Sequence, residues 1–122
     1  MAAENSKGFL DVVLNGITGR NIYNAETLSA ALDLSTAANA GRYAQILKLD
    51  PGGAHRDVTL EAEADYPGLL RLFVNAADAA ENLVIKNDGG STIGTVNQNE
   101  AGLFACDGSA WTLVAIWTIA LS

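Results

Sequence analysis

Cysteine, histidine and proline are scarce in this chain of 122 residues, which contains one Cys, one His and two Pro. A disulfide framework is excluded, because a single cysteine has no partner within the chain. Zinc binding is not expected, because a zinc site needs about four ligands, most often Cys and His. Cys106 stands among apolar residues and is interpreted as a buried, unreactive thiol.

His55 is the only histidine that could act as the base in a nucleophilic mechanism. It lies in a glycine-containing turn beside Asp57, which could orient it, but no nucleophile-elbow motif accompanies it. We therefore interpret His55 as a solvated turn residue and predict no catalytic residue. No glycine pattern typical of a nucleotide-binding loop occurs either, so the sequence predicts no cofactor and no enzymatic activity.

Positive charge is also scarce, since seven basic residues face fourteen acidic ones and the net charge is -7 at pH 7. The basic residues are scattered singly, whereas binding to phosphates requires clustered Lys and Arg, so no nucleic-acid partner is expected. The N-terminus has no apolar core of signal-peptide length, and the apolar run from Trp111 to Leu121 is about half as long as a membrane-spanning helix. These features predict a protein that is made in the cytoplasm and has no membrane partner.

The carboxylates offer one candidate site. Glu61, Glu63 and Asp65 alternate, so that in an extended chain their side chains point to the same side. Such a group could bind a hard cation like Ca²⁺, which prefers several oxygen ligands. It could equally be a solvated acidic loop, and since the spacing does not match an EF-hand, no metal site is predicted.

Short runs of leucine and β-branched residues separated by tight turns dominate the remaining sequence. In the segment 69–75, Leu70, Leu72 and Val74 alternate with Leu69, Arg71 and Phe73, which is the period of a strand. Asp88-Gly89-Gly90 and Asp107-Gly108 predict two hairpins, and Pro51-Gly52-Gly53 predicts a chain reversal. The strands are expected over residues 43–50, 57–60, 69–75, 83–87, 92–96, 102–106 and 109–120.

The segment 24–35 is ambiguous. Asn24 could cap a helix with Leu28 and Leu32 on one face, but Leu28, Ala30, Leu32 and Leu34 also alternate strictly, and the β-rich context favours a strand. No internal repeat of 20–50 residues is apparent. The sequence therefore predicts an all-β protein: a single antiparallel β-sandwich, jelly-roll-like, over residues 23–122, preceded by a short N-terminal arm over residues 1–22.

Both ends of the chain contain candidate binding residues. In the arm, Phe9, Leu10, Val12 and Leu14 are candidates for docking on a partner, although the same run could be an ordinary first strand. At the C-terminus, both faces of the strand pattern are apolar. This strand could be buried centrally, or its end could reach a subunit interface; the interface candidates are Trp111, Trp117, Ile119 and Leu121.

Four blocks of the sequence, 46–60, 68–77, 83–93 and 106–111, together resemble small virion proteins of tailed bacteriophages. The closest resemblance is to head decoration, or cement, proteins with a β-sandwich or jelly-roll body. The resemblance implies a homotrimer that is seated on the capsid surface, contacts the major capsid protein through its N-terminal arm, and carries no catalytic residues. It predicts a non-enzymatic protein of the virion that stabilises the assembled capsid. The alternative is a receptor- or glycan-binding module of a tail fibre or spike, where similar blocks ending in Asp-Gly-x-x-Trp occur.

Overall fold

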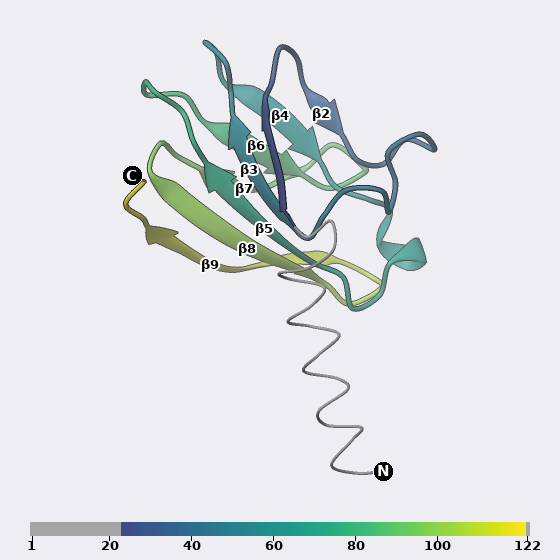
Figure 1. Cartoon of the computed structure of the whole chain (residues 1–122). Coiled ribbons are helices and arrows are strands. Elements are labelled where there is room, and N and C mark those ends of the chain that lie inside the picture. The colour runs from purple at the N-terminus through teal and green to yellow at the C-terminus, as the bar shows by residue number, and fades with distance from the viewer. Residues whose placement is uncertain (1–22, 122) are drawn as a thin grey trace, which may run out of the picture.

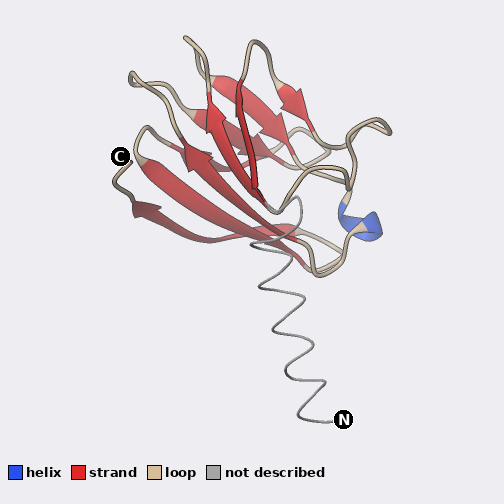
Figure 2. Ribbon diagram, viewed as in Figure 1, coloured by secondary structure: helices blue, strands red, loops and turns tan. Residues whose placement is uncertain are grey.

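The chain folds into two layers of β-strands, and the computed structural model describes residues 23–121 (Figures 1 and 2). The five-stranded sheet consists, in spatial order, of β1 (Tyr23–Thr27), β3 (Ile46–Asp50), β5 (Leu70–Asn75), β8 (Glu100–Cys106) and β9 (Trp111–Thr118). The four-stranded sheet consists of β2 (Leu32–Asp33), β4 (Arg56–Thr59), β6 (Leu83–Lys86) and β7 (Thr92–Val96). A single 3₁₀ turn, η1 (Glu63–Asp65), completes the described elements. The predicted all-β fold is confirmed.

The pairing of the strands differs from the prediction. The chain crosses to the opposite sheet after each of the strands β1 to β5, so successive strands of one sheet run in the same direction. β1, β3 and β5 therefore pair in parallel, as do β2, β4 and β6. The expectation of an antiparallel, jelly-roll-like sandwich is wrong for this half of the molecule, which winds around a common core. Both sheets are mixed.

The turn Pro51-Gly52-Gly53 shows why the pairing was mispredicted. Gly52 and Gly53 have φ angles of 75° and 101°, which glycine adopts without strain. The turn carries the chain from β3 in one sheet to β4 in the other, instead of folding two strands into a hairpin. Turn residues thus indicate where the chain changes direction, but they do not determine which strand the next segment pairs with.

The two predicted hairpins are confirmed and form the antiparallel part of each sheet. β6 pairs with β7 across Asp88-Gly89-Gly90, and β8 pairs with β9 across Asp107-Gly108. The Asp107 carboxylate accepts hydrogen bonds from the backbone N–H groups of Ser109 and Ala110, both at 2.8 Å, which fixes the second turn. These bonds lower the pKa of Asp107 below its ordinary value.

The core lies between the two sheets. Its fully buried side chains come from both layers: Leu34, Leu47, Leu49, Val58, Leu60, Phe73, Leu83, Ile85, Val96 and Phe104. Phe73 and Phe104 pack edge to face with their ring centres 5.8 Å apart. Strand β5 turns Arg71, Phe73 and Asn75 inward, whereas Leu70 on its other face is 44% exposed. An inward arginine requires a buried partner, which the structure supplies.

The ambiguous segment contains strand and no helix. β1 begins one residue before it and β2 is only two residues long, while Leu28, Leu32 and Leu34 are buried as the alternating pattern required and Ala30 is exposed. The predicted arm and its docking candidates Phe9, Leu10, Val12 and Leu14 lie outside the described residues. Within residues 23–121, no helix is long and apolar enough to cross a membrane.

Candidate functional site

A buried ion pair occupies the end of the core nearest to η1. Arg71 and Glu61 are exposed by only 1% and 0%, and the two side chains form a two-pronged contact in which Nε of Arg71 lies 3.3 Å from Oε1 of Glu61. Arg71 also donates to the carbonyl oxygens of Tyr43, at 3.1 Å, and Ala44. The indole N–H of Trp111 donates to the Glu61 carbonyl oxygen at 2.9 Å. This cluster joins four separate segments of the chain and satisfies both charges.

The three alternating carboxylates of the sequence do not form one site. Glu61 is neutralised by Arg71, and Glu63 and Asp65 lie on η1. Glu63 instead approaches Asp88 in the β6–β7 hairpin: a hydrogen bond with Asp88 raises the pKa of the Glu63 carboxyl above its ordinary value of 4.5. Burial and the negative charge of Asp88 act in the same direction.

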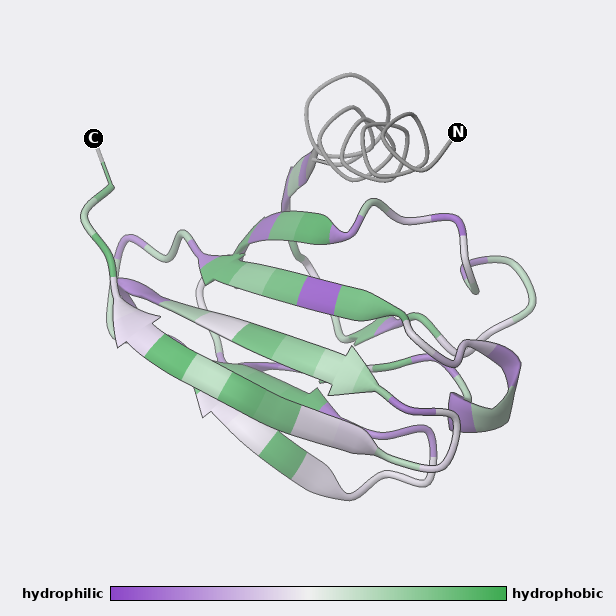
Figure 3. Cartoon of the chain, turned by 90° about the horizontal axis from the view of Figure 1, so that it is seen from below, coloured by the Kyte–Doolittle hydropathy of each residue, from purple (hydrophilic) through white to green (hydrophobic). Residues whose placement is uncertain are grey.

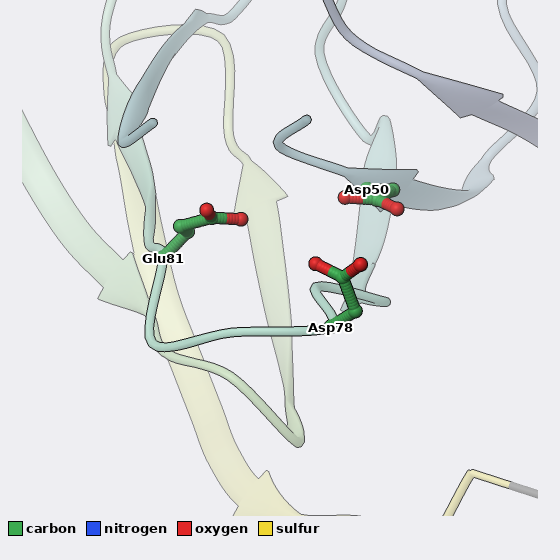
Figure 4. A group of neighbouring side chains, drawn as sticks. All are labelled: Asp50, Asp78 and Glu81. Carbon is green, nitrogen blue, oxygen red and sulfur yellow. The ribbon is translucent and has the colours of Figure 1, made fainter. Parts of the chain in front are cut away.

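A different acidic group comes together where β3 ends. Asp50, Asp78 and Glu81 each place a carboxylate oxygen within 4.8 Å of the other two (Figure 4). Buried Asn75 holds the loop in place, since its side-chain amide donates to the Glu81 carbonyl oxygen at 2.8 Å. Carboxylate oxygens are the ligands that hard cations prefer, so this group is a candidate place for one. One oxygen of Asp50 already accepts the N–H of Gly52 at 2.9 Å.

The sequence did not indicate this acidic group. Asp50 is the last residue of β3, while Asp78 and Glu81 belong to the loop between β5 and β6. Only the parallel pairing of β3 with β5 brings the two segments together. Between Asp50 and this loop the chain passes through the opposite sheet, and the length of that passage sets their separation in the sequence. A search for short residue spacings therefore cannot detect such a group.

His55 has a local structural contact. It is exposed, and its Nδ1 accepts the backbone N–H of Asn82 at 2.9 Å. Asp57, which could have oriented it, instead pairs with Lys86 at 3.0 Å. Cys106 is buried, as expected, and its Sγ lies 3.4 Å from the Glu63 carbonyl oxygen.

The outer face of the five-stranded sheet carries many apolar side chains. Hydrophobic residues recur along β5, β8 and β9, which lie side by side (Figure 3). One outward row of register partners contains Ala25, Lys48, Val74, Ala101 and Trp117, and the next contains Ile46, Leu72, Leu103 and Ala115. Lys48 is the only charged side chain in these two rows. We call this surface the outer apolar face.

A shallow hollow lies on the outer apolar face, where β3 and β5 begin. It has a volume of about 140 Å³ and is lined by Gln45, Ile46, Leu70, Leu72 and Leu103. Four of these five side chains are apolar. The hollow can accept an aliphatic or aromatic group from a partner, and nothing in its lining provides a charged group for chemistry.

The four C-terminal interface candidates separate into two groups. Trp111 is only 6% exposed and belongs to the core of its own chain, where it supports Glu61. Trp117 and Leu121 are 43% and 41% exposed, and Ile119 is half-buried. A role for these last three at a subunit contact stays a prediction. The alternating sequence pattern could not separate the two tryptophans, because both fall on one face of a regular strand and the bulge in β9 shifts the register between them.

Comparison with known proteins yields no match: no family model, no curated protein and no solved structure is similar to this chain.

Proposed function

We propose that this protein is a non-enzymatic structural component of a phage virion that binds the outside of an assembled capsid and stabilises it. The observation that carries the proposal is the outer apolar face, on which Leu70 and Trp117 are 44% and 43% exposed. A contiguous apolar surface of this kind is typical of a site that is buried against another protein. The resemblance of the sequence to head decoration proteins supplies the kind of partner, the major capsid protein.

The proposed stabilisation needs no chemistry. A protein that binds the assembled lattice but not the free subunits shifts the equilibrium towards the lattice by mass action. The same binding site is repeated over the capsid surface, so many weak contacts add up and a modest affinity at each site is sufficient.

The proposal is tested by co-sedimentation of the full chain with assembled capsids and, separately, with unassembled major capsid protein. We expect saturable binding to capsids only, and a higher temperature of capsid disruption when the protein is bound. Leu70→Asp should weaken binding at least tenfold, because it places an unpaired charge in the contact. Thr92→Asp, at an exposed position in the four-stranded sheet, is the matched control and should bind like the unaltered chain.

Two results would contradict the proposal. Absence of binding to capsids would exclude the capsid seat, and equal binding to capsids and free subunits would exclude stabilisation by selective binding. If the protein instead binds purified glycans or a cell-surface receptor, the alternative role as a tail-fibre or spike module gains support.

A further inference from the structure

We propose that the free edge of β9 pairs in antiparallel fashion with β9 of a second copy of this chain, which joins two five-stranded sheets into one continuous sheet. The inference goes beyond the proposed function, because it concerns how the protein assembles with itself before any capsid is present.

Within residues 23–121, one side of the β9 backbone pairs with no other strand. β9 is the last strand of the five-stranded sheet and pairs only with β8 among the residues that the structure describes. With eight residues it is the longest described strand. Its outer N–H and C=O groups are therefore available for a further ladder, which is how one chain adds a strand to another.

Strand β9 lacks two of the features by which proteins usually block such an edge. Charged side chains and proline are the common ones, and after Asp107 the chain contains neither. The other edges are blocked more clearly. β1 carries an exposed Glu26, β2 has only two residues, and β7 is a short strand interrupted by Gly94.

Exposed apolar side chains on β9 also favour burial against a partner. Val114 and Trp117 are 56% and 43% exposed, although both are large and apolar. Val114 is the extra residue of a bulge, because Ala115 pairs with Leu103 whereas Leu113 pairs with Phe104. After the bulge the edge is regular over residues 115–118, and we place the centre of the new ladder there, next to Trp117.

The distribution of charge selects a second copy as the partner. The chain carries a net charge of -7, so two copies repel each other over most of their surface. The segment after Asp107 is free of charge, and two such segments can meet without that cost. An antiparallel strand pair about a two-fold axis is also self-complementary, since every contact is made twice.

The proposal differs from the homotrimer that the resemblance implies. A two-fold contact closes with two copies, whereas a trimer needs a different surface on each side of the contact. The mass of the protein in solution therefore distinguishes the two assemblies.

The first experiment is sedimentation equilibrium of the full chain over a range of concentrations without capsids. We expect a reversible dimer. A monomer at all concentrations, or a trimer, would overturn the proposal. Because no capsid is present, this failure is distinct from a failure of the proposed function, which is judged from capsid binding alone.

The second experiment compares Trp117→Lys with Leu70→Lys. The two side chains are almost equally exposed and belong to the same sheet, but Trp117 lies on the edge strand and Leu70 lies on β5, away from the edge. Trp117→Lys should abolish the dimer, because it places two positive charges close together in an interface from which water is excluded. Leu70→Lys should leave the dimer intact. Loss of the dimer in both variants would show contact through the outer apolar face and overturn edge pairing.

Hydrogen–deuterium exchange of the unaltered chain supplies a measurement that needs no variant. Amides of residues 115–118 that point away from β8 should become protected as the concentration rises and the dimer forms. If a dimer forms and these amides exchange equally fast at low and high concentration, the free edge of β9 is not the contact.

Discussion

At the scale of single residues, the pair formed by Arg71 and Glu61 is the most consequential feature of the core. Both side chains are removed from water, and each satisfies the charge of the other. Burying a charge costs far more than burying a neutral polar group, so neither member can be tolerated alone. The sequence placed Arg71 on an apolar strand face but gave no signal of whether that face was buried.

We predict that Arg71→Leu destabilises the protein by about 3–5 kcal/mol, because it leaves the Glu61 carboxylate buried without a counter-charge. The double variant Arg71→Leu/Glu61→Leu should be less destabilised than the sum of the two single variants. Urea unfolding of the three variants measures the coupling. Additive effects would mean that the pair contributes no coupled stabilisation.

A second residue-scale prediction concerns Glu63 and Asp88. The pKa of Glu63 is raised in the folded state, so the folded protein holds its proton more tightly than the unfolded chain does. Stability is therefore lowered when pH rises through the folded-state pKa, and the loss is recovered as pH falls towards the ordinary value of 4.5. Glu63→Gln should stabilise the protein at pH 7, and this gain should shrink as the pH approaches 4.5.

Thermal unfolding of Glu63→Gln across this pH range checks the prediction. Asp88→Asn removes the other half of the contact and should give a gain with the same pH dependence. A gain of equal size at both ends of the range would contradict the role assigned to this carboxyl pair.

At the scale of elements, the turn between β3 and β4 packs closely against the chain that follows β1. A Cβ atom on Gly52 would overlap the carbonyl oxygen of Leu28, whereas a Cβ atom on Gly53 would meet nothing within 4 Å. Both residues have positive φ, so alanine strains the backbone at either position, and only at Gly52 does a close approach add to the strain. Gly53→Ala should cost about 1–3 kcal/mol from backbone strain alone.

We predict that Gly52→Ala lowers the free energy of unfolding clearly more than Gly53→Ala. The turn and the backbone at Leu28 must move apart to make room for the methyl group. Denaturant unfolding of the two variants under the same conditions provides the comparison. Equal losses would mean that the Leu28 contact is not important for the stability of the turn.

The strands were largely predictable from the sequence, but their partners were not. Alternating apolar residues and Asp-Gly turns located β5, β6, β7 and the β8–β9 hairpin to within a few residues. The segment 24–35 was interpreted as one strand, but the structure divides it into the end of β1 and the two-residue β2, and Tyr-Asn-Ala-Glu-Thr has no apolar alternation that could mark where β1 lies. The acidic group at Asp50, Asp78 and Glu81 escaped prediction, since it exists only after β3 and β5 have paired.

At the scale of the whole molecule, the described body begins at β1 and includes every strand that the two sheets contain within residues 23–121. We predict that a chain beginning at Ile22 folds with the same β-sheet content as the full chain but no longer binds capsids. The reason is that Phe9, Leu10, Val12 and Leu14, the predicted docking residues, are removed with the first 21 positions.

Circular dichroism and capsid co-sedimentation of this shortened chain provide the two measurements. Unfolding would show that the removed residues belong to the body. Unchanged capsid binding would show that the docking candidates do not contact the capsid.

The winding of β1 to β6 has a consequence for the order in which the protein folds. Each parallel pair joins strands separated by a passage through the opposite sheet, so neither sheet can form before the other. Among residues 23–121, only β6–β7 and β8–β9 are hairpins whose strands are neighbours in the chain, and hairpins close faster than pairings that require long loops. We therefore expect folding to start in the C-terminal half and proceed towards β1. On the ribosome, the segments that emerge first would then wait for the last ones before they acquire stable structure.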